Sequence, residues 1–376
     1  MGPLKGVRII EVGGIGPGPF CAMMLSDMGA DVIRVNRRGD PGRSEPKYEI
    51  LHRGRPSIGV DLKKPKGIEL ILRLIEKADA LQEGFRPGVM EKLGVGPEVC
   101  LKRNPKLVYG RMTGWGQEGP LSQASGHDIN YIALTGALYS IGRGDQNPVP
   151  PLNLVGDFGG GGMLLAFGMA CALFESQRSG KGQVIDAAMV DGAASLMAMF
   201  YGLRAAGLWT DERASNFLDS GAHYYDTYET ADGKWISVGS IEPQFYQLLL
   251  RHSGIDDPEF QNQNAREKWP EFKKRMTEIF KTRTREEWCG IMQRTDVCFG
   301  PVLTMGEALE HPHNVARQTF IEIEKVPQPA PAPRFSRTPP EVRGPARMGP
   351  EHTESALRDW GITKKEIEKL IADEVI

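Results

Sequence analysis

The sequence has few cysteines and little net charge. None of the five cysteines forms a CxxC pair, and no Cys/His cluster has zinc-finger spacing, so we expect no metal site. Scattered thiols of this kind are typical of free cysteines in a reducing compartment. The net charge of −2 argues against a bulk nucleic-acid partner.

Long apolar runs are also missing. The longest apolar stretches are interrupted by glycine or charge well short of a membrane-spanning length, so we expect no membrane span. The N-terminal MGPLKGVRIIEV leads directly into a strand pattern, which argues against a signal peptide. The C-terminal ADEVI is not a peroxisomal tripeptide, so we expect a cytoplasmic protein.

Strand and helix patterns alternate through the first half of the chain. The apolar VRIIEV (7–12) ends in the glycine turn GGIGPGP, a helical pattern follows, and DVIRV (31–35) is typical of a second strand. This alternation predicts an α/β fold with a Rossmann-like open parallel sheet. After residue 225, two alternating segments around an ADG turn and three helical patterns predict a smaller α+β domain.

The domain boundaries follow from these changes in pattern. We expect a large α/β domain over 1–200, to which 320–376 return, with a long helix within 183–207 after a short strand. A linker over 201–224 would lead to the small domain at 225–305. An extended Pro-rich linker would then cover 306–350.

The first glycine turn does not match the dinucleotide fingerprint, because Pro19 occupies a position that the pattern needs free. The second strand ends in VNRRGD, so Arg37 and Arg38 stand where an acid would bind the ribose of NAD. A basic pair at this place suits a phosphorylated ribose, as in NADP or coenzyme A. Two solvated arginines without a ligand are an equally simple interpretation.

Four acidic or basic residues at expected helix starts are candidates for chemistry. His127, in GHDINYIALTGAL, is either a capping residue or a base held at a helix start, and Asp128 could cap that helix. Asp157 precedes four glycines in LNLVGDFGGGGM. As an N-cap it implies no chemistry, but the glycines would let a ligand reach bare N–H groups that suit an oxyanion. Glu242 precedes a proline, where the helix dipole favours an acid.

These stretches together resemble the family III CoA-transferase superfamily, in the same order from about residue 4 to beyond 335. They are VGGIGPGPFCAMMLSDMGADVIRV, FRPGVMEKLGVGP, RMTGWGQEGP, GHDINYIALTGAL, PLNLVGDFGGGGM, SGKGQVIDAAMVDG, SIEPQFY and APAPRFSRTP. The aspartate-plus-glycine region marks the superfamily. GHDINY together with IEPQFY is more specifically similar to its alpha-methylacyl-CoA racemase branch.

The resemblance implies a catalytic pair, His127 and Asp157, with Glu242 bonded to His127. It also implies an acyl-CoA substrate, no metal, no cofactor apart from the CoA of the substrate, and an interlocked homodimer. His223 departs from the family pattern, and it would alter the acyl pocket. The CoA-contacting residues that the resemblance implies are Arg37, Val60, Asp61, Leu62, Lys63, Gly84, Phe85, Arg86, Lys92, Gly126 and Tyr131.

The implied reaction inverts the α-carbon of a 2-methylacyl-CoA by 1,1-proton transfer through an enolate, with two acid/base groups on opposite faces of that carbon. Three alternatives remain open. A CoA-transferase of the same fold would use Asp157 as a covalent nucleophile. An NADP-dependent oxidoreductase would use the basic pair after the second strand. A non-catalytic acyl-CoA-binding protein would leave the acid/base residues without a role. The acyl group itself is not fixed by the sequence.

Overall fold

The computed structural model describes residues 2–40 and 44–376, and the chain divides into two compact units. Unit 1 comprises Met1–Thr135, Pro151–Met197 and Gln318–Ile376, and unit 2 comprises Gly136–Pro150 and Ala198–Arg317. The boundaries expected from the sequence differ from this division. Residues 136–150, expected in the large domain, and residues 201–224 and 306–317, expected in linkers, belong to unit 2.

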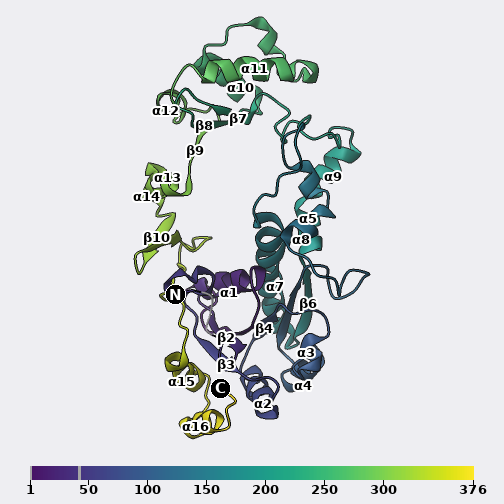
Figure 1. Ribbon diagram of the computed structural model, residues 1–376, viewed down its shortest axis with the longest axis vertical. Coiled ribbons are helices and arrows are strands. Elements are labelled where there is room, and N and C mark those ends of the chain that lie inside the picture. The colour runs from purple at the N-terminus through teal and green to yellow at the C-terminus, as the bar shows by residue number, and fades with distance from the viewer. Residues whose placement is uncertain (1, 41–43) are drawn as a thin grey trace. The chain divides into compact units, whose positions relative to one another are not determined.

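Unit 1 is built on a six-stranded parallel sheet of order β3-β2-β1-β4-β5-β6 (Figure 1). This is the strand order of a Rossmann fold, so the predicted fold class is confirmed. Successive residues of β1 point to opposite faces, since Ile10 belongs to one apolar cluster and Ile9 to the other. The strands are β1 (Arg8–Val12), β2 (Asp31–Arg37), β3 (Ser57–Val60), β4 (Ala80–Glu83), β5 (Val108–Thr113) and β6 (Gln183–Ala188).

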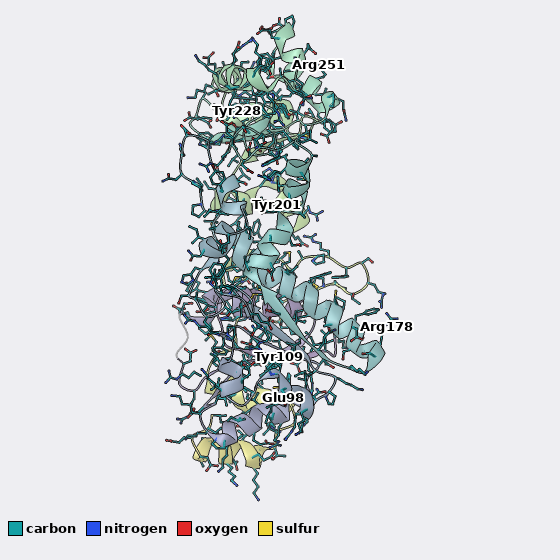
Figure 2. All side chains as sticks on the ribbon, turned by 90° about the vertical axis from the view of Figure 1, so that its right-hand side faces the viewer. Glu98, Tyr109, Arg178, Tyr201, Tyr228 and Arg251 are labelled. Carbon is teal, nitrogen blue, oxygen red and sulfur yellow. The ribbon has the colours of Figure 1, made fainter. Side chains whose placement is uncertain are left out.

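Helices cover both faces of this sheet. The first apolar cluster joins one face to α2, α4, α15 and α16, and Figure 2 labels one of its buried members, Tyr109 of β5. The second cluster joins the other face to α1 and α7. The helices of unit 1 are α1 (Pro17–Asp27), η1 (Pro46–Tyr48), η2 (Ile50–His52), α2 (Pro65–Ile75), α3 (Val89–Lys92), α4 (Pro97–Arg103), α5 (Asp128–Ala133), η3 (Leu154–Met163), α7 (Leu164–Ser179), α8 (Met189–Leu196), α15 (Pro350–Asp359) and α16 (Lys364–Ala372).

The helix α7 ends where the sequence predicts, at Gly180, which adopts φ +73°. By length and composition alone, the helical stretch Leu154–Ser179 could cross a membrane, and it is the one such stretch among residues 2–40 and 44–376. Leu165 and Met169 of α7 are fully buried in the second apolar cluster of the sheet. The apolar character of α7 is therefore also that of a core helix.

The chain after β6 departs from two expectations. Instead of one long helix after β6, the chain forms α8 and then α9, with a break at Met197. The segment 306–350, expected to be an extended Pro-rich linker, is not wholly extended, because it begins with the helices α13 (Met305–Glu310) and α14 (Pro312–Arg317). The antiparallel pair β10 (Phe320–Ile323) and β11 (Val326–Pro329) follows. The predicted capping box of α16 is confirmed, since Thr363 and Glu366 satisfy each other's backbone N–H groups.

Unit 2 has its own core around a three-stranded antiparallel sheet, β7-β8-β9. The hairpin predicted around the ADG turn is confirmed as the β7–β8 pair. The elements of unit 2 are α6 (Ala137–Ser140), α9 (Ala198–Ala205), β7 (Tyr225–Glu229), β8 (Trp235–Gly239), α10 (Pro243–Ser253), η4 (Pro258–Gln261), η5 (Arg266–Lys268), α11 (Trp269–Phe280), α12 (Arg285–Met292), β9 (Phe299–Val302), α13 (Met305–Glu310) and α14 (Pro312–Arg317).

Candidate active site

A cleft of about 920 Å³ opens in unit 1 beyond the carboxyl ends of β1 and β4. These strands are neighbours in the sheet, but the chain after β1 packs on one face and the chain after β4 on the other. Such a switch point leaves a crevice in which α/β proteins bind ligands. The glycine turn 13–18 and the segment 84–87 line two of its sides.

Asp157 lines the cleft from η3, which is a π-helix rather than the start of an α-helix. Asn153 Nδ2 donates a hydrogen bond to Asp157 Oδ2 at 3.0 Å. The turn after β1 also approaches this carboxylate, because a Cβ placed on Gly16 would lie 3.1 Å from Oδ2. Burial raises the pKa of Asp157, and the nearby Asp128 carboxylate raises it further, whereas Asn153 and His127 lower it.

His127 lines the same cleft from the N-cap position of α5. Its backbone N–H donates to Asn130 Oδ1 at 3.0 Å, which fixes the start of the helix, and its side chain is exposed. His127 is one of the two groups that lower the pKa of Asp157, which places it within electrostatic reach of that carboxyl group. The structure thus brings together in one cleft the two acid/base residues that the sequence predicts.

The Asp128 side chain contacts a segment outside its own helix. Its Oδ2 accepts hydrogen bonds from the backbone N–H groups of Gly156 and Asp157, each at 2.7 Å. The carboxylate therefore binds the first turn of η3, although the sequence suggested that it could cap α5. Nothing in the sequence indicated this contact, because the two segments are 28 residues apart and meet only in the folded unit.

The four glycines after Asp157 do not form the bare N-terminus that the sequence suggested. They lie inside η3, and three of them allow close packing against neighbouring helices. A Cβ on Gly160 would lie 2.5 Å from the backbone N of Ala193 in α8, and one on Gly162 would lie 2.5 Å from the carbonyl oxygen of Pro17 in α1. The expected bare helix start is therefore wrong, and the oxyanion role proposed for it stays a prediction; three of these glycines let neighbouring helices approach closely.

The expected CoA-contacting residues fall into two groups. The cleft is lined by Arg37, Gly84, Phe85, Arg86, Gly126 and Tyr131. Val60, Asp61, Leu62, Lys63 and Lys92 are not among the described residues that line it, and their contact with CoA stays a prediction. The first of these segments packs on the C-terminal residues, since the Asp61 N–H donates to the Val375 carbonyl oxygen at 2.8 Å.

Sequence reasoning missed a buried charge cluster at the cleft. Arg34 and Arg55 both pair with Glu11, which is only 1% exposed, and Arg34 also donates to the carbonyl oxygen of Gly14 at 3.2 Å. Although burial alone would raise the pKa of Glu11, the two arginines hold it below its ordinary value. Charged residues inside otherwise apolar strands, as in RIIEV and DVIRV, were the signal that could have revealed this cluster.

His52 and Trp115 are also cleft residues that the sequence did not reveal. Burial lowers the pKa of His52 to about 4, and the Arg34 guanidinium contributes to this shift. Trp115 packs edge-on against Tyr131, with ring centroids 4.8 Å apart. Trp115 stands in the stretch RMTGWGQEGP and His52 in none of the stretches quoted above, but no sequence pattern assigned either residue to the site, and only the folded unit places them at the cleft.

Glu242 belongs to unit 2, where it is the exposed N-cap residue of α10. The carbonyl oxygen of Glu242 accepts hydrogen bonds from the Phe245 and Tyr246 N–H groups, each at 3.0 Å. This geometry agrees with an acid at a helix start. The pairing of Glu242 with His127 stays a prediction.

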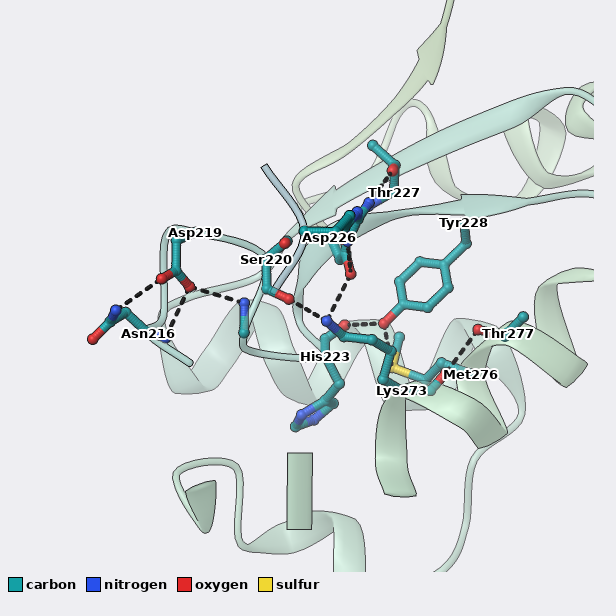
Figure 3. A network of polar contacts seen from close by, with 12 residues as sticks. Asn216, Asp219, Ser220, His223, Asp226, Thr227, Tyr228, Lys273, Met276 and Thr277 are labelled. Carbon is teal, nitrogen blue, oxygen red and sulfur yellow. Dashed lines mark hydrogen bonds and ion pairs between the residues drawn. The ribbon is translucent and has the colours of Figure 1, made fainter. Parts of the chain in front are cut away.

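His223 lies in the aromatic core of unit 2 rather than among the residues that line the cleft of unit 1. Its Nε2 is 2.7 Å from the Tyr246 hydroxyl, and its carbonyl oxygen accepts a hydrogen bond from the Tyr228 hydroxyl (Figure 3). Burial lowers the pKa of His223 to about 3, and the Lys273 ammonium adds to this shift. These contacts give His223 a structural role.

Residues 2–40 and 44–376 contain no group of three or more His, Cys, Asp or Glu side chains that could hold a metal ion. The described site therefore consists of a crevice at a Rossmann switch point, a histidine, a carboxylate with a raised pKa, and basic side chains.

This fold and site define an α/β protein of the CAIB/BAIF type. The solved structure of a CAIB/BAIF family protein from Brucella suis matches with a TM-score of 0.83 and 25% identity, over 96% of this chain and 99% of that chain. Residues 4–353 match the CoA-transferase family III, and the chain belongs to this family.

Two curated relatives are similar over nearly their whole length. Alpha-methylacyl-CoA racemase of Mus musculus is 48% identical over 376 residues, which are 99% of this chain and 97% of that protein. The protein of the same name from Homo sapiens is 46% identical over 378 residues, with the same coverage. The resemblance seen in the sequence motifs is thus confirmed.

Proposed function

We propose that this protein is an alpha-methylacyl-CoA racemase, an isomerase that inverts the α-carbon of 2-methylacyl-CoA thioesters. One observation carries the proposal: a single cleft at the switch point of the sheet is lined by two side chains capable of acid/base chemistry, His127 and Asp157. The relatives that bear this name, 46% and 48% identical, support it.

The two side chains suit a proton transfer that changes configuration. The α-proton must leave on one face of the carbon, and another must arrive on the opposite face, so one group acts as base while the other, protonated, acts as acid. The raised pKa of Asp157 favours the protonated carboxyl group that half of the cycle needs. The electron pair moves to the thioester oxygen, which forms an enolate. Glu242 would orient His127, as the acid of a catalytic triad does.

Substrate binding follows from the same cleft. The basic side chains of Arg37 and Arg86 line it and would meet the phosphate groups of CoA, while Gly84 and Gly126 leave room for the chain of the ligand. We propose no separate cofactor, because CoA is part of the substrate.

We further propose a homodimer. Leu164, Phe167 and Phe174 are exposed along α7, and their spacing places them on one face of that helix. An apolar face of this kind is typical of a protein–protein interface. Light scattering tests the proposal: Phe167→Glu should shift the dimer toward the monomer.

In cells, we propose a cytoplasmic enzyme of fatty acid metabolism.

A CoA-transferase is the second candidate, and the family match itself favours it. Asp157 would attack the thioester carbonyl, forming a mixed anhydride and releasing CoA thiolate. The thiolate would then attack the aspartyl carbonyl of the anhydride, which gives an aspartyl-CoA thioester and releases the acyl group of the donor as a free carboxylate. This scheme does not require His127. Hydroxylamine trapping, or a covalent adduct mass on Asp157, would favour the transferase.

The deciding experiment uses a single enantiomer of a 2-methylacyl-CoA in deuterated water without any acceptor acid. A racemase exchanges the α-proton for deuterium while optical purity is lost, and both are followed by mass spectrometry and chiral chromatography. If the wild-type protein neither exchanges nor racemises a panel of branched acyl and aryl-propionyl esters, the proposed function is wrong.

A further inference from the structure

Asp128 connects the two segments that carry the proposed acid/base residues. It follows His127 directly and is the first residue of α5, and it is 6% exposed. Its Oδ2 receives the N–H groups of Gly156 and Asp157 at 2.7 Å each. The Asp128 carboxylate, next to His127 in the chain, therefore fixes the backbone of Asp157.

The surroundings of Asp128 are built for this contact. A Cβ on Gly156 would lie 2.6 Å from Asp128 Oδ2, so only glycine leaves room for the carboxylate to reach both N–H groups. The second oxygen, Oδ1, is buried and has no hydrogen-bond partner among residues 2–40 and 44–376. A buried carboxylate oxygen without a partner costs stability. Such a cost is more typical of a functional residue than of one that only ties α5 to η3 by hydrogen bonds, a contact called the tether below.

Asp128 also contributes to the charge around Asp157. The titratable groups that face Asp157 are Asp128, His127 and Tyr131, all on α5 or at its N-cap, and Asn153 of the same segment donates to its carboxylate. Among them, Asp128 is the group whose negative charge favours a proton on Asp157. Asp128 is not among the residues that line the cleft, so it acts on the substrate only through its neighbours.

We propose that Asp128 is a positioning residue of the racemase: its carboxylate holds the Asp157 backbone in register with His127 and places a negative charge beside the Asp157 carboxyl group. The proposal rests on the two-base function proposed above. It predicts that Asp128 governs turnover rather than substrate affinity, because it fixes the reacting groups without touching the ligand.

Two variants separate the tether from the charge. Asp128→Ala removes both hydrogen bonds, and we expect kcat to fall about 100-fold, while KM for the acyl-CoA changes by no more than about threefold. Asp128→Asn keeps an acceptor oxygen but removes the charge, so the acidic limb of the kcat/KM profile should move to lower pH. Asp191→Asn is the matched control, because Asp191 is an exposed first-turn acid of α8 outside the cleft lining, and it should behave as wild type.

A second measurement tests the tether without any activity. Hydrogen exchange of a peptide covering 153–163 should be faster in Asp128→Ala than in wild type and Asp191→Asn. Unchanged exchange there would overturn the tether even if the proposed reaction is correct. An acidic limb that does not move in Asp128→Asn, or a kcat equal to that of wild type, would overturn the role in turnover. The hydrogen-exchange measurement tests the tether even if the wild-type protein racemises no substrate.

Discussion

A methyl group added at Gly192 should separate the two helices that hold the site together. Gly192 is a buried residue of α8, and its ideal Cβ would lie 1.8 Å from the carbonyl oxygen of Gly160 and 2.5 Å from its carbonyl carbon. These are backbone atoms of η3, so no side chain can rotate away to make room. Gly192→Ala therefore requires a movement of η3, the element that carries Asp157.

The size of the effect follows from that overlap. An ordinary contact at a Cβ is about 3.4 Å or longer, so η3 and α8 must separate by roughly 1.5 Å. Overpacking of a core commonly costs about 1–3 kcal/mol, and a clash with rigid backbone belongs at the upper end of that range. A loss of about 3 kcal/mol lowers the Tm of a domain of this size by about 6–12 °C. Because a displacement of about 1 Å in a catalytic group can cost 100-fold, racemisation should fall by at least as much.

Urea unfolding and racemisation measured on the same preparation test this prediction. The control is Gly168→Ala in the interior of α7, where a Cβ meets Ile185 at an ordinary 3.4 Å. This control should gain about 0.5–1 kcal/mol, since alanine restricts the unfolded chain. If Gly192→Ala is as stable and as active as the control, the close crossing of η3 and α8 does not exist.

Three further predictions concern single side chains. His127→Ala and Asp157→Ala should each abolish racemisation, while affinity for a CoA ester in calorimetry stays within about threefold; full activity in either variant contradicts the two-base scheme. Burial lowers the pKa of His223 to about 3, so between pH 3 and the ordinary histidine pKa of about 6.5 only the unfolded chain binds a proton there. The free energy of unfolding should therefore fall by on the order of 4 kcal/mol as the pH drops from about 6.5 toward 3. His223→Gln should therefore unfold at a lower pH than wild type in circular dichroism titrations. An acid-unfolding midpoint identical to that of wild type would contradict this role of His223. Glu11→Gln leaves the buried Arg55 without its charged partner, so the free energy of unfolding should fall by about 3–5 kcal/mol in urea titrations. A loss below about 1 kcal/mol would contradict a stabilising role of this ion pair.

Much of unit 1 could be predicted because its pattern is local. Alternating strands and helices, a glycine turn after β1 and a glycine at the end of α7 are all visible in short windows of sequence. The position of His127 at a helix start follows in the same way. Since ligands of parallel α/β folds bind at the carboxyl ends of the strands, these elements also indicate the edge at which the site lies.

The rest depends on contacts between distant segments. Asp157 lies in a π-helix, a form that no short sequence pattern specifies, and the glycines beside it reflect the path of α8 and α1. The bond from Asp128 to the η3 backbone joins residues that no motif links. A run of glycines beside an acid is equally compatible with ligand access and with close helix packing, and only the folded unit reveals the close packing.

The division of unit 1 into three stretches of sequence has a consequence for synthesis of the protein. All six strands of the sheet are complete by Ala188, yet the first apolar cluster also needs Leu357 of α15, Trp360 directly after it and Ile367 of α16. A ribosome makes these residues only after all of unit 2. For more than 150 residues of translation, one face of the nascent sheet therefore lacks part of its cover. Chaperones that bind exposed apolar strands have their longest opportunity to act on this chain during that interval.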